Sequence, residues 1–408
     1  METVGPRFFS VILLFLGSFI SCAPNNSSLD PNILKMEALL LPPMVAKGFR
    51  IVSTIEYNFD NPYAIAVDSK DNVYVAEKSW TCDVQHDYTG GCPLYVTTTR
   101  SRVLKFDPSG KFLGWLGLDT TGSTGFHSAP TNAVAAFGLN PEEFTIIGGL
   151  ATDAQDRLYV SDAYRIQRFD SSLNFEAWLG KASDNTIGWH TTGQPQGNPN
   201  ATQDDGAMNT FGAISFYGNK IYAAEEVLYY VNRYDQSGTY EGWLGKDTND
   251  VKGWHTPLAG VSYFRGTFHG NDIGAFDIAK DIAIDPTNGN LLVVDSVHDP
   301  VLSIWAPDGT YLNGLFHTGS TGTGEKPYAI AIDSFGNVII SDMYQGTIRG
   351  YNSSLQQRAT LQVELPSIPN VYYPIVGAKL TVASNGYLYA VHQTWNRILK
   401  IKIVYSEW

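Results

Sequence analysis

Short runs of alternating apolar and polar residues recur along the chain, and each is followed by a turn rich in Asp, Asn or Gly. Six segments repeat this pattern, and they begin at Asn61, Gly148, Phe211, Lys280, Lys326 and Gly377. Each segment holds three such runs, and four segments continue into a fourth: "KFLGWLG", "NFEAWLGK", "TYEGWLGK" and "TYLNGLF". A period of two is typical of strands. The pattern predicts a repeated unit of about four short antiparallel strands.

The two ends of the repeat region complement each other. The last unit stops after three runs, at "RILKIKIVYSEW", and an additional run, "FRIVSTIEYNF", begins at Phe49 before the first unit. This N-terminal run can become the outer strand of the last unit, which closes a ring and removes an unpaired edge. We therefore expect an all-β fold, a six-bladed β-propeller closed by its N-terminal strand, with seven blades as the alternative.

Two of the segments resemble NHL repeats. They are "PYAIAVDSKDNVYVAE" and "KPYAIAIDSFGNVIISD", which match a Pro-x-Gly-Ile-Ala-Val-Asp strand, a turn and a Val-Tyr-Val-Ala-Asp strand. The resemblance covers most of residues 49–408 and implies a propeller. In four units an Asp follows the first strand, at Asp68, Asp153, Asp285 and Asp333. The third and sixth units depart from the pattern, with Phe216 and Ala383 expected at that place.

The N-terminus carries a segment of a different kind. Residues 8–20 form an apolar run behind Arg7, with the length of a signal-peptide core and too short to cross a bilayer. The run ends in Phe-Ile-Ser before Cys22, which resembles the lipobox of bacterial lipoproteins, with Phe19 where Leu is usual. The resemblance implies a lipid on Cys22; simple secretion is the alternative.

The following stretch, "APNNSSLDPN", is too polar to bury apolar surface and is typical of a flexible tether. We therefore expect a lipoprotein signal peptide at 1–21, the lipidated cysteine and tether at 22–48, and the propeller at 49–408. The expected location is the cell envelope, anchored on the outer side of the cytoplasmic membrane or on the outer membrane. Without lipidation the protein would be secreted.

The other two cysteines, Cys82 and Cys92, flank the short polar loop "DVQHDYTGG". In an exported protein such a pair is most simply a disulfide. Two thiolates on a metal would need further ligands at suitable spacing, and His86 is the one nearby.

The charge balance restricts the partners. The chain has 40 acidic and 27 basic residues and a net charge of −13, so its field repels phosphate backbones. Nucleic acid is therefore excluded as a partner, whereas the membrane is contacted through the lipid.

Four long connections are predicted to emerge on one face of the propeller, which we call the loop-rich face. They are residues 78–101, 118–147, 182–210 and 247–279. Long loops on a rigid scaffold often carry function. We expect this face to bind a protein or a glycan, and the candidate binding residues are Trp189, Trp254, Tyr63, Tyr328 and Asp281.

Three of these connections contain Gly-aromatic-His, and "LFHTGSTG" is a shortened fourth version. The histidines are His127, His190, His255 and His317. They could form a ring that binds a metal, for which calcium or zinc would be the candidate, or an anion. Alternatively each His, with Phe126, Trp189 or Trp254, holds its loop to the neighbouring blade by a hydrogen bond and ring packing.

A second ring is predicted at the ends of the second strands, at Glu77, Asp162, Glu225, Asp295, Asp342 and His392. Five carboxylates near one face could bind a cation. In NHL-type repeats, however, this acid fixes the following turn through backbone hydrogen bonds.

Enzymes of similar six-bladed form, calcium-dependent lactonases and amidating lyases, hold a metal in the central channel. Here the residues that open the first strands are Tyr63, Gly148, Phe211, Lys280, Asp281, Tyr328 and Lys379, a poor set of calcium ligands. The chain has no nucleophile elbow, His-Glu-x-x-His motif or phosphate loop.

The sequence thus favours a lipid-anchored binding propeller over an enzyme and implies no definite cofactor. The alternative is a metal-assisted lyase or hydrolase with its site in the channel, to which loops could deliver His269, His298 or Asp272. A structural envelope scaffold is a third hypothesis.

Overall fold

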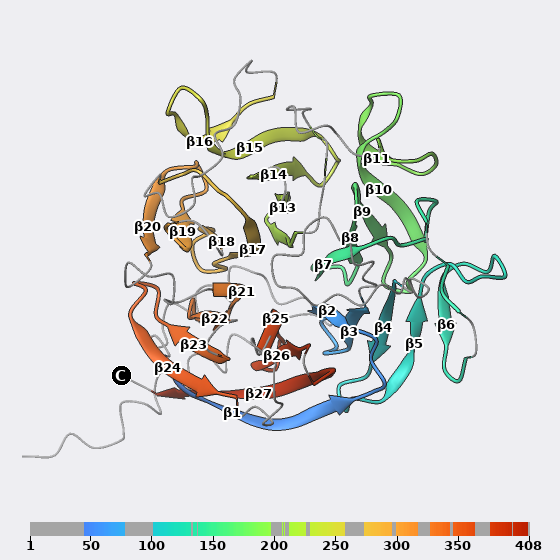
Figure 1. Ribbon diagram of the computed structural model, residues 1–408, viewed down its shortest axis with the longest axis horizontal. Coiled ribbons are helices and arrows are strands. Elements are labelled where there is room, and N and C mark those ends of the chain that lie inside the picture. Colours follow the sequence, from blue (N-terminus) through green and yellow to red (C-terminus); the bar gives the residue numbers. More distant parts are fainter. Residues whose placement is uncertain are drawn as a thin grey trace, which may run out of the picture. The chain divides into compact units, whose positions relative to one another are not determined.

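Six antiparallel β-sheets are arranged in a ring in the computed structural model (Figure 1). The structure describes residues 45–77, 101–131, 134–136, 138–196, 206, 208, 212–225, 229–257, 273–295, 299–316, 327–342, 346–363, 376–393 and 395–406. Within these ranges, no helix is long and apolar enough to cross a membrane. The predicted all-β, six-bladed propeller is confirmed.

Blades 1 to 3 each have five strands, ordered from the channel outward. Blade 1 contains β2 (Pro62–Val67), β3 (Val73–Glu77), β4 (Arg102–Phe106), β5 (Phe112–Leu116) and β6 (Phe126–Ser128). Blade 2 contains β7 (Ile147–Thr152), β8 (Leu158–Asp162), β9 (Arg165–Phe169), β10 (Phe175–Lys181) and β11 (Ile187–His190). Blade 3 contains β12 (Ile214–Tyr217), β13 (Lys220–Glu225), β14 (Tyr230–Asp235), β15 (Tyr240–Lys246) and β16 (Lys252–His255).

Blades 4 to 6 have four strands each in the part of the chain that the structure describes. Blade 4 contains β17 (Ala279–Ile284), β18 (Leu291–Asp295), β19 (Leu302–Trp305) and β20 (Tyr311–Leu315). Blade 5 contains β21 (Pro327–Ile332), β22 (Val338–Asp342), β23 (Thr347–Tyr351) and β24 (Gln357–Gln362). Blade 6 contains β25 (Val376–Val382), β26 (Tyr387–His392), β27 (Arg397–Ser406) and β1 (Val45–Glu56).

The N-terminal strand closes the ring, as predicted. β1 is the outermost strand of blade 6 and pairs antiparallel with β27, from Val45 opposite Ser406 to Glu56 opposite Arg397 (Figure 1). It begins at Val45 rather than at Phe49, so its first residues belong to the segment expected to be tether. Ala46 and Ile55 of β1 are buried, and this burial favours closure.

The core lies between neighbouring blades. The second strands β3, β8, β18 and β22 are buried at all five positions. Their nearly continuous apolar sequences follow from this, because a sheet covered on both faces has no solvent side.

The fifth strands β6, β11 and β16 are the main departure from the sequence-based expectation. The Gly-aromatic-His segments form them, and they lie at the outer edge of blades 1 to 3 rather than in loops around the channel (Figure 1). Gly242 explains how the backbones approach so closely, because a Cβ there would collide with the carbonyl oxygen of His255. Its φ of +127° also favours glycine.

The turns between first and second strands are tight, and their face of the ring is called the hairpin face below. Asp68 shows why they are tight: its carboxylate accepts the backbone N–H of Lys70 at 3.0 Å and of Asn72 at 2.9 Å. In blade 3 the corresponding residue is Tyr217 and not Phe216. The strand pairing shows this: Ser215 lies opposite Tyr222 in blade 3, as Ala66 lies opposite Tyr74 in blade 1. Asp68 comes two residues after Ala66, so its counterpart comes two residues after Ser215.

Candidate functional site

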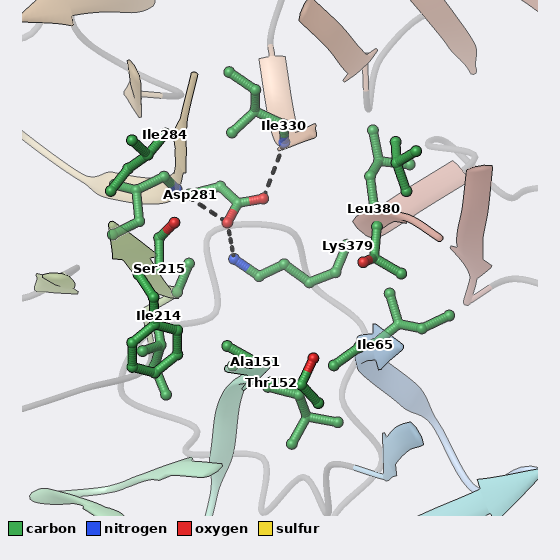
Figure 2. Close-up of a pocket in the computed structure, with 18 of the residues that line it drawn as sticks. Ile65, Ala151, Thr152, Ile214, Ser215, Asp281, Ile284, Ile330, Lys379 and Leu380 are labelled. Carbon is green, nitrogen blue, oxygen red and sulfur yellow. Dashed lines mark hydrogen bonds and ion pairs between the residues drawn. The ribbon is translucent and has the colours of Figure 1, made fainter. Parts of the chain in front are cut away.

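A cavity of about 490 Å³ occupies part of the central channel (Figure 2). The six innermost strands surround it, and each contributes a large apolar residue to one ring: Ile65, Leu150, Ile214, Ile282, Ile330 and Leu380. Most of the other described lining residues follow these toward the ends of the strands, as far as Pro286 in the turn after β17. Four come one residue before the ring: Gly149, Ala213, Asp281 and Lys379. The cavity therefore lies in the half of the channel nearer the hairpin face, away from the loop-rich face.

Backbone groups make this wall more polar than its side chains suggest. Each innermost strand is the last strand of its sheet, so one of its edges faces the channel without a partner strand. Three contacts show these edges: Ile330 N–H donates to Asp281 at 2.9 Å, Lys280 C=O accepts from Lys379 at 2.9 Å, and Val67 C=O accepts from Thr152. The channel-facing strand edges therefore carry both backbone donors and backbone acceptors.

A buried ion pair lies among the residues that line the cavity. Lys379 Nζ, from β25 of blade 6, lies 2.9 Å from Asp281 Oδ1, on β17 of blade 4 (Figure 2). Asp281 Oδ2 accepts the N–H of Ile330 on β21, so the pair links blades 4, 5 and 6. Burial raises the pKa of the Asp281 carboxyl, and the neighbouring Lys379 ammonium opposes that rise.

The two charges occupy equivalent positions in the repeat. Asp281 lies opposite Val294, one residue before the end of β18, and Lys379 has the matching place beside β26. The other four blades have small residues there: Ala64, Gly149, Ala213 and Ala329. The sequence signal for this pair was a charge at a position where the other repeats have Ala or Gly.

Lys280 lies near two aromatic rings on the loop-rich side of the ion pair. Its Nζ is 4.8 Å from the ring centre of Tyr328 and 6.0 Å from that of Tyr63, which belongs to blade 1. Tyr63 is buried and Tyr328 is half-buried. Three of the five expected binding-face residues, Tyr63, Tyr328 and Asp281, thus lie around the channel.

The other two, Trp189 and Trp254, lie at the outer rim in contacts between blades. Trp189 Nε1 donates to Gln236 C=O of blade 3 at 3.0 Å, and the guanidinium of Arg168 lies 4.1 Å from its ring centre. Trp254 repeats this arrangement with Pro307 C=O of blade 4 at 3.2 Å and Arg233 at 4.0 Å. Both indoles therefore join one blade to the next.

The described histidines of the repeated motif lie on three different blades. The rings of His127, His190 and His255 stack on Trp115, Trp178 and Trp243, with ring centres 4.1, 4.3 and 3.9 Å apart. Each Nε2 is also close to a backbone carbonyl oxygen, at 3.1 to 3.3 Å, in the fourth strand for His190 and His255 and directly after it, at Gly117, for His127. The expected hydrogen bond and ring packing are present, but within the same blade, whereas Trp189 and Trp254 make the contacts with the neighbouring blades.

Residues at the ends of the second strands are buried and hold the chain that leads into the same blade. Glu77 accepts the N–H of Asp60 at 2.7 Å, Asp162 that of Thr145 at 2.7 Å, and Asp295 that of Asp277 at 2.7 Å. These three acids thus bind backbone N–H groups, as expected for NHL-type repeats. The N–H groups belong to the segment before the first strand of the blade, however, and not to the turn after the second strand.

His392 is the sixth member of the ring. It stacks on Trp395 with ring centres 4.0 Å apart, and its Nδ1 accepts the N–H of Trp395 at 3.3 Å. Burial lowers the pKa of His392 to about 4, so this side chain is neutral at neutral pH.

Several predicted residues lie outside the described part of the chain: Cys22, Cys82, Cys92, Phe211, His269, Asp272, His298 and His317. The predicted lipidation and disulfide and the role of His317 therefore stay predictions. Among the residues that the structure describes, no group of three or more His, Cys, Asp or Glu side chains could hold a metal.

No family model matches the chain, and no curated protein matches it. Solved structures with a similar fold include a streptogramin B lyase, 11% identical, with 87% of this chain and 98% of that chain covered and a TM-score of 0.44. Virginiamycin B lyase from Staphylococcus aureus, catalytically inactive and with quinupristin, is 12% identical, with 87% and 100% covered and a TM-score of 0.45. Its selenomethionine form is 11% identical, with 87% and 99% covered and a TM-score of 0.45. Likeness at this level concerns the fold and carries no argument about function.

Proposed function

We propose that this protein is an exported, lipid-anchored binding propeller that holds a small polar molecule in its channel cavity. The observation that carries the proposal is the cavity itself, about 490 Å³ in volume and bounded by the free edges of six inner strands. Ligand sites in proteins typically have volumes of about 300–1,000 Å³ and combine an apolar wall with a few polar groups. The aliphatic ring and the backbone donors and acceptors supply both.

The cavity differs from the binding site expected on the loop-rich face, and the two can be separated by substitution. Thr381 lines the cavity, so Thr381→Phe should narrow it and obstruct a ligand there. Thr360, exposed on β24, provides the matched control Thr360→Phe. Tyr328→Ala instead alters the loop-rich end of the channel.

The test is a thermal-shift and calorimetric screen of the full chain against small sugars, amides and amino acids. A ligand bound by the unaltered chain and by Thr360→Phe, and lost in Thr381→Phe, supports the cavity. A ligand kept by Thr381→Phe and lost in Tyr328→Ala would move the site to the loop-rich mouth, where the protein or glycan partner was expected. Absence of any ligand from the whole screen contradicts the proposal.

Lipid anchoring through Cys22 forms the second part of the proposal. Its support is the apolar run at 8–20 followed directly by the cysteine and a polar tether. Cys22→Ser should release the protein from the membrane fraction and leave its folding unchanged. A variant that still partitions with detergent would contradict lipidation.

A further inference from the structure

We infer that the channel cavity selects an uncharged ligand rich in hydroxyl or amide groups, and that Asp281 and Lys379 contact it together. This inference rests on the proposed function, because it names the ligand class of the same site. The ion pair leaves part of its hydrogen-bonding capacity unused, on both partners.

Lys379 has one ammonium donor to spare among the described residues. An ammonium group has three N–H donors. Its contacts are Asp281 Oδ1 and Lys280 C=O, both at 2.9 Å. Lys379 also lines the cavity, and its side chain extends between the surrounding strands to Asp281 (Figure 2). A ligand oxygen in the cavity can therefore accept the third N–H.

Asp281 has spare acceptor capacity on the same side. A carboxylate offers about four lone-pair sites. In the described structure Oδ1 accepts from Lys379 and from Ile282 N–H, at 2.9 and 3.0 Å, and Oδ2 accepts from Ile330 N–H at 2.9 Å. Oδ2 can thus accept one more hydrogen bond. A single ligand hydroxyl could donate to Asp281 and accept from Lys379.

The charge balance of the cavity decides against a charged ligand. Asp281 and Lys379 are the ionisable side chains among the described lining residues, and their opposite charges lie 2.9 Å apart. An anionic or cationic group near the pair would be attracted by one partner and repelled by the other at almost the same distance. It would also lose its hydration, which a buried charge recovers only from a well-placed counter-ion. A neutral hydroxyl or amide avoids this cost.

The rest of the wall suits a polyhydroxylated molecule. The hydroxyls of Thr152, Ser215 and Thr381 lie among the lining residues, beside the channel-facing strand edges. The ring of Ile and Leu side chains offers apolar surface to the C–H groups of such a molecule. A neutral monosaccharide combines these features, and it defines the probes for the test.

The experiment compares four probes that share one ring and differ in charge: glucose, glucuronamide, glucuronate and protonated glucosamine. Binding to the full chain, kept in a detergent without a sugar headgroup, is measured by saturation-transfer NMR and calorimetry. We expect glucose and glucuronamide to bind within about threefold of each other. Glucuronate and glucosamine should each bind at least about tenfold more weakly.

Substitutions of the pair give the sharper result. Asp281→Asn leaves the Lys379 charge uncompensated, so the preference should change to glucuronate. The double variant Asp281→Asn with Lys379→Gln has no net charge at this position and should again prefer glucose. It replaces the single variant in the test if the single variant fails to fold. Asp250→Asn removes an exposed carboxylate that also pairs with a lysine, and it should leave all preferences unchanged.

Two results would overturn the inference and leave the proposed function standing. One is binding of glucuronate or glucosamine to the unaltered chain as tight as that of glucose. The other is failure of all four probes while another ligand from the screen is still lost in Thr381→Phe. If no ligand of any class binds, the proposed function and this inference both fail.

Discussion

Blades 1 to 3 and blades 4 to 6 differ in the strands at their outer edge and in the charges beside the channel. In the first half of the ring a fifth strand covers each outer edge, and Trp189 and Trp254 reach from it to the next blade. In the second half, β20, β24 and β1 are the outermost described strands, and the Asp281–Lys379 pair joins three blades beside the channel. One repeat can thus be reinforced at its rim or at its centre.

The difference follows from single positions in the repeat. In blade 1 Trp115 lies opposite Leu104 and provides the surface on which His127 stacks. In blade 4 the matching residue, opposite Ser303, is Gly314. Without an indole, β20 lacks the surface against which the fifth strands of the other half are held. In blades 1 to 3 the Trp of the fourth strand thus supports the His of the fifth.

The largest effect is expected from removal of β1. Deletion of residues 45–56 exposes the edge of β27 and the buried surface around Ala46 and Ile55, and we expect a loss of at least about 5 kcal/mol in the free energy of unfolding. Urea unfolding followed by circular dichroism measures it. Deletion of 26–43, which ends before β1, is the control and should change little. An unchanged unfolding midpoint without β1 would contradict closure by this strand.

The next largest effect is expected at the channel. Lys379→Met leaves the buried Asp281 carboxylate without its counter-ion, and we expect a loss of about 3–5 kcal/mol. Adding Asp281→Asn removes the uncompensated charge and should recover most of the stability. The comparison is again by urea unfolding, with Lys246→Met as the control, since its partner Asp250 is largely exposed. Equal losses in the single and double variants would show that the charge is not the cause.

At the rim, Trp189→Ala and Trp254→Ala should have similar and smaller effects. Each removes an indole that packs on an arginine and hydrogen-bonds to the next blade, and we expect about 1–3 kcal/mol for each. Leu312→Ala, on the outer strand of blade 4, is the matched change in the other half and should cost less, because Leu312 is 49% exposed. Equal losses in the free energy of unfolding at all three positions would contradict a special role of the two indoles in blades 2 and 3.

The smallest effect is the dependence of the free energy of unfolding on pH, to which His392 in blade 6 contributes. Burial lowers the pKa of His392 to about 4, below the usual value of about 6.5 in an unfolded chain. Between these values the unfolded chain binds more protons, so the stability falls as the pH falls. We expect a loss of about 1–2 kcal/mol between pH 7 and pH 5. His392→Gln should reduce this slope in thermal unfolding at several pH values; an unaltered slope would contradict a buried neutral His392.

The repeats and the closing strand could be predicted from the sequence because both depend on local features. Alternation of apolar residues and Asp-rich turns such as that at Asp68 determine strands and hairpins over a few residues. The missing fourth run of the last unit and the additional run at the N-terminus then leave one arrangement without an open edge.

The fifth strands and the ion pair could not be predicted in this way. β6 has only three residues, and it is held by the stacking of His127 on Trp115 rather than by its own propensity. Asp281 and Lys379 are 98 residues apart, and they meet because a long side chain crosses the channel between blades. Both features depend on tertiary contacts, so the sequence pattern suggested loops and isolated charges instead.

The antiparallel pairing of β1 with β27 has a mechanical consequence. Tension enters the propeller at Val45 when the segment before it is pulled, and Val45 lies opposite Ser406 at one end of a long ladder. A pull along the strand axis loads the hydrogen bonds between β1 and β27 in shear, so that many must break together rather than one after another. For a pull in that direction, the strand that closes the ring thus also resists force applied from the N-terminal side.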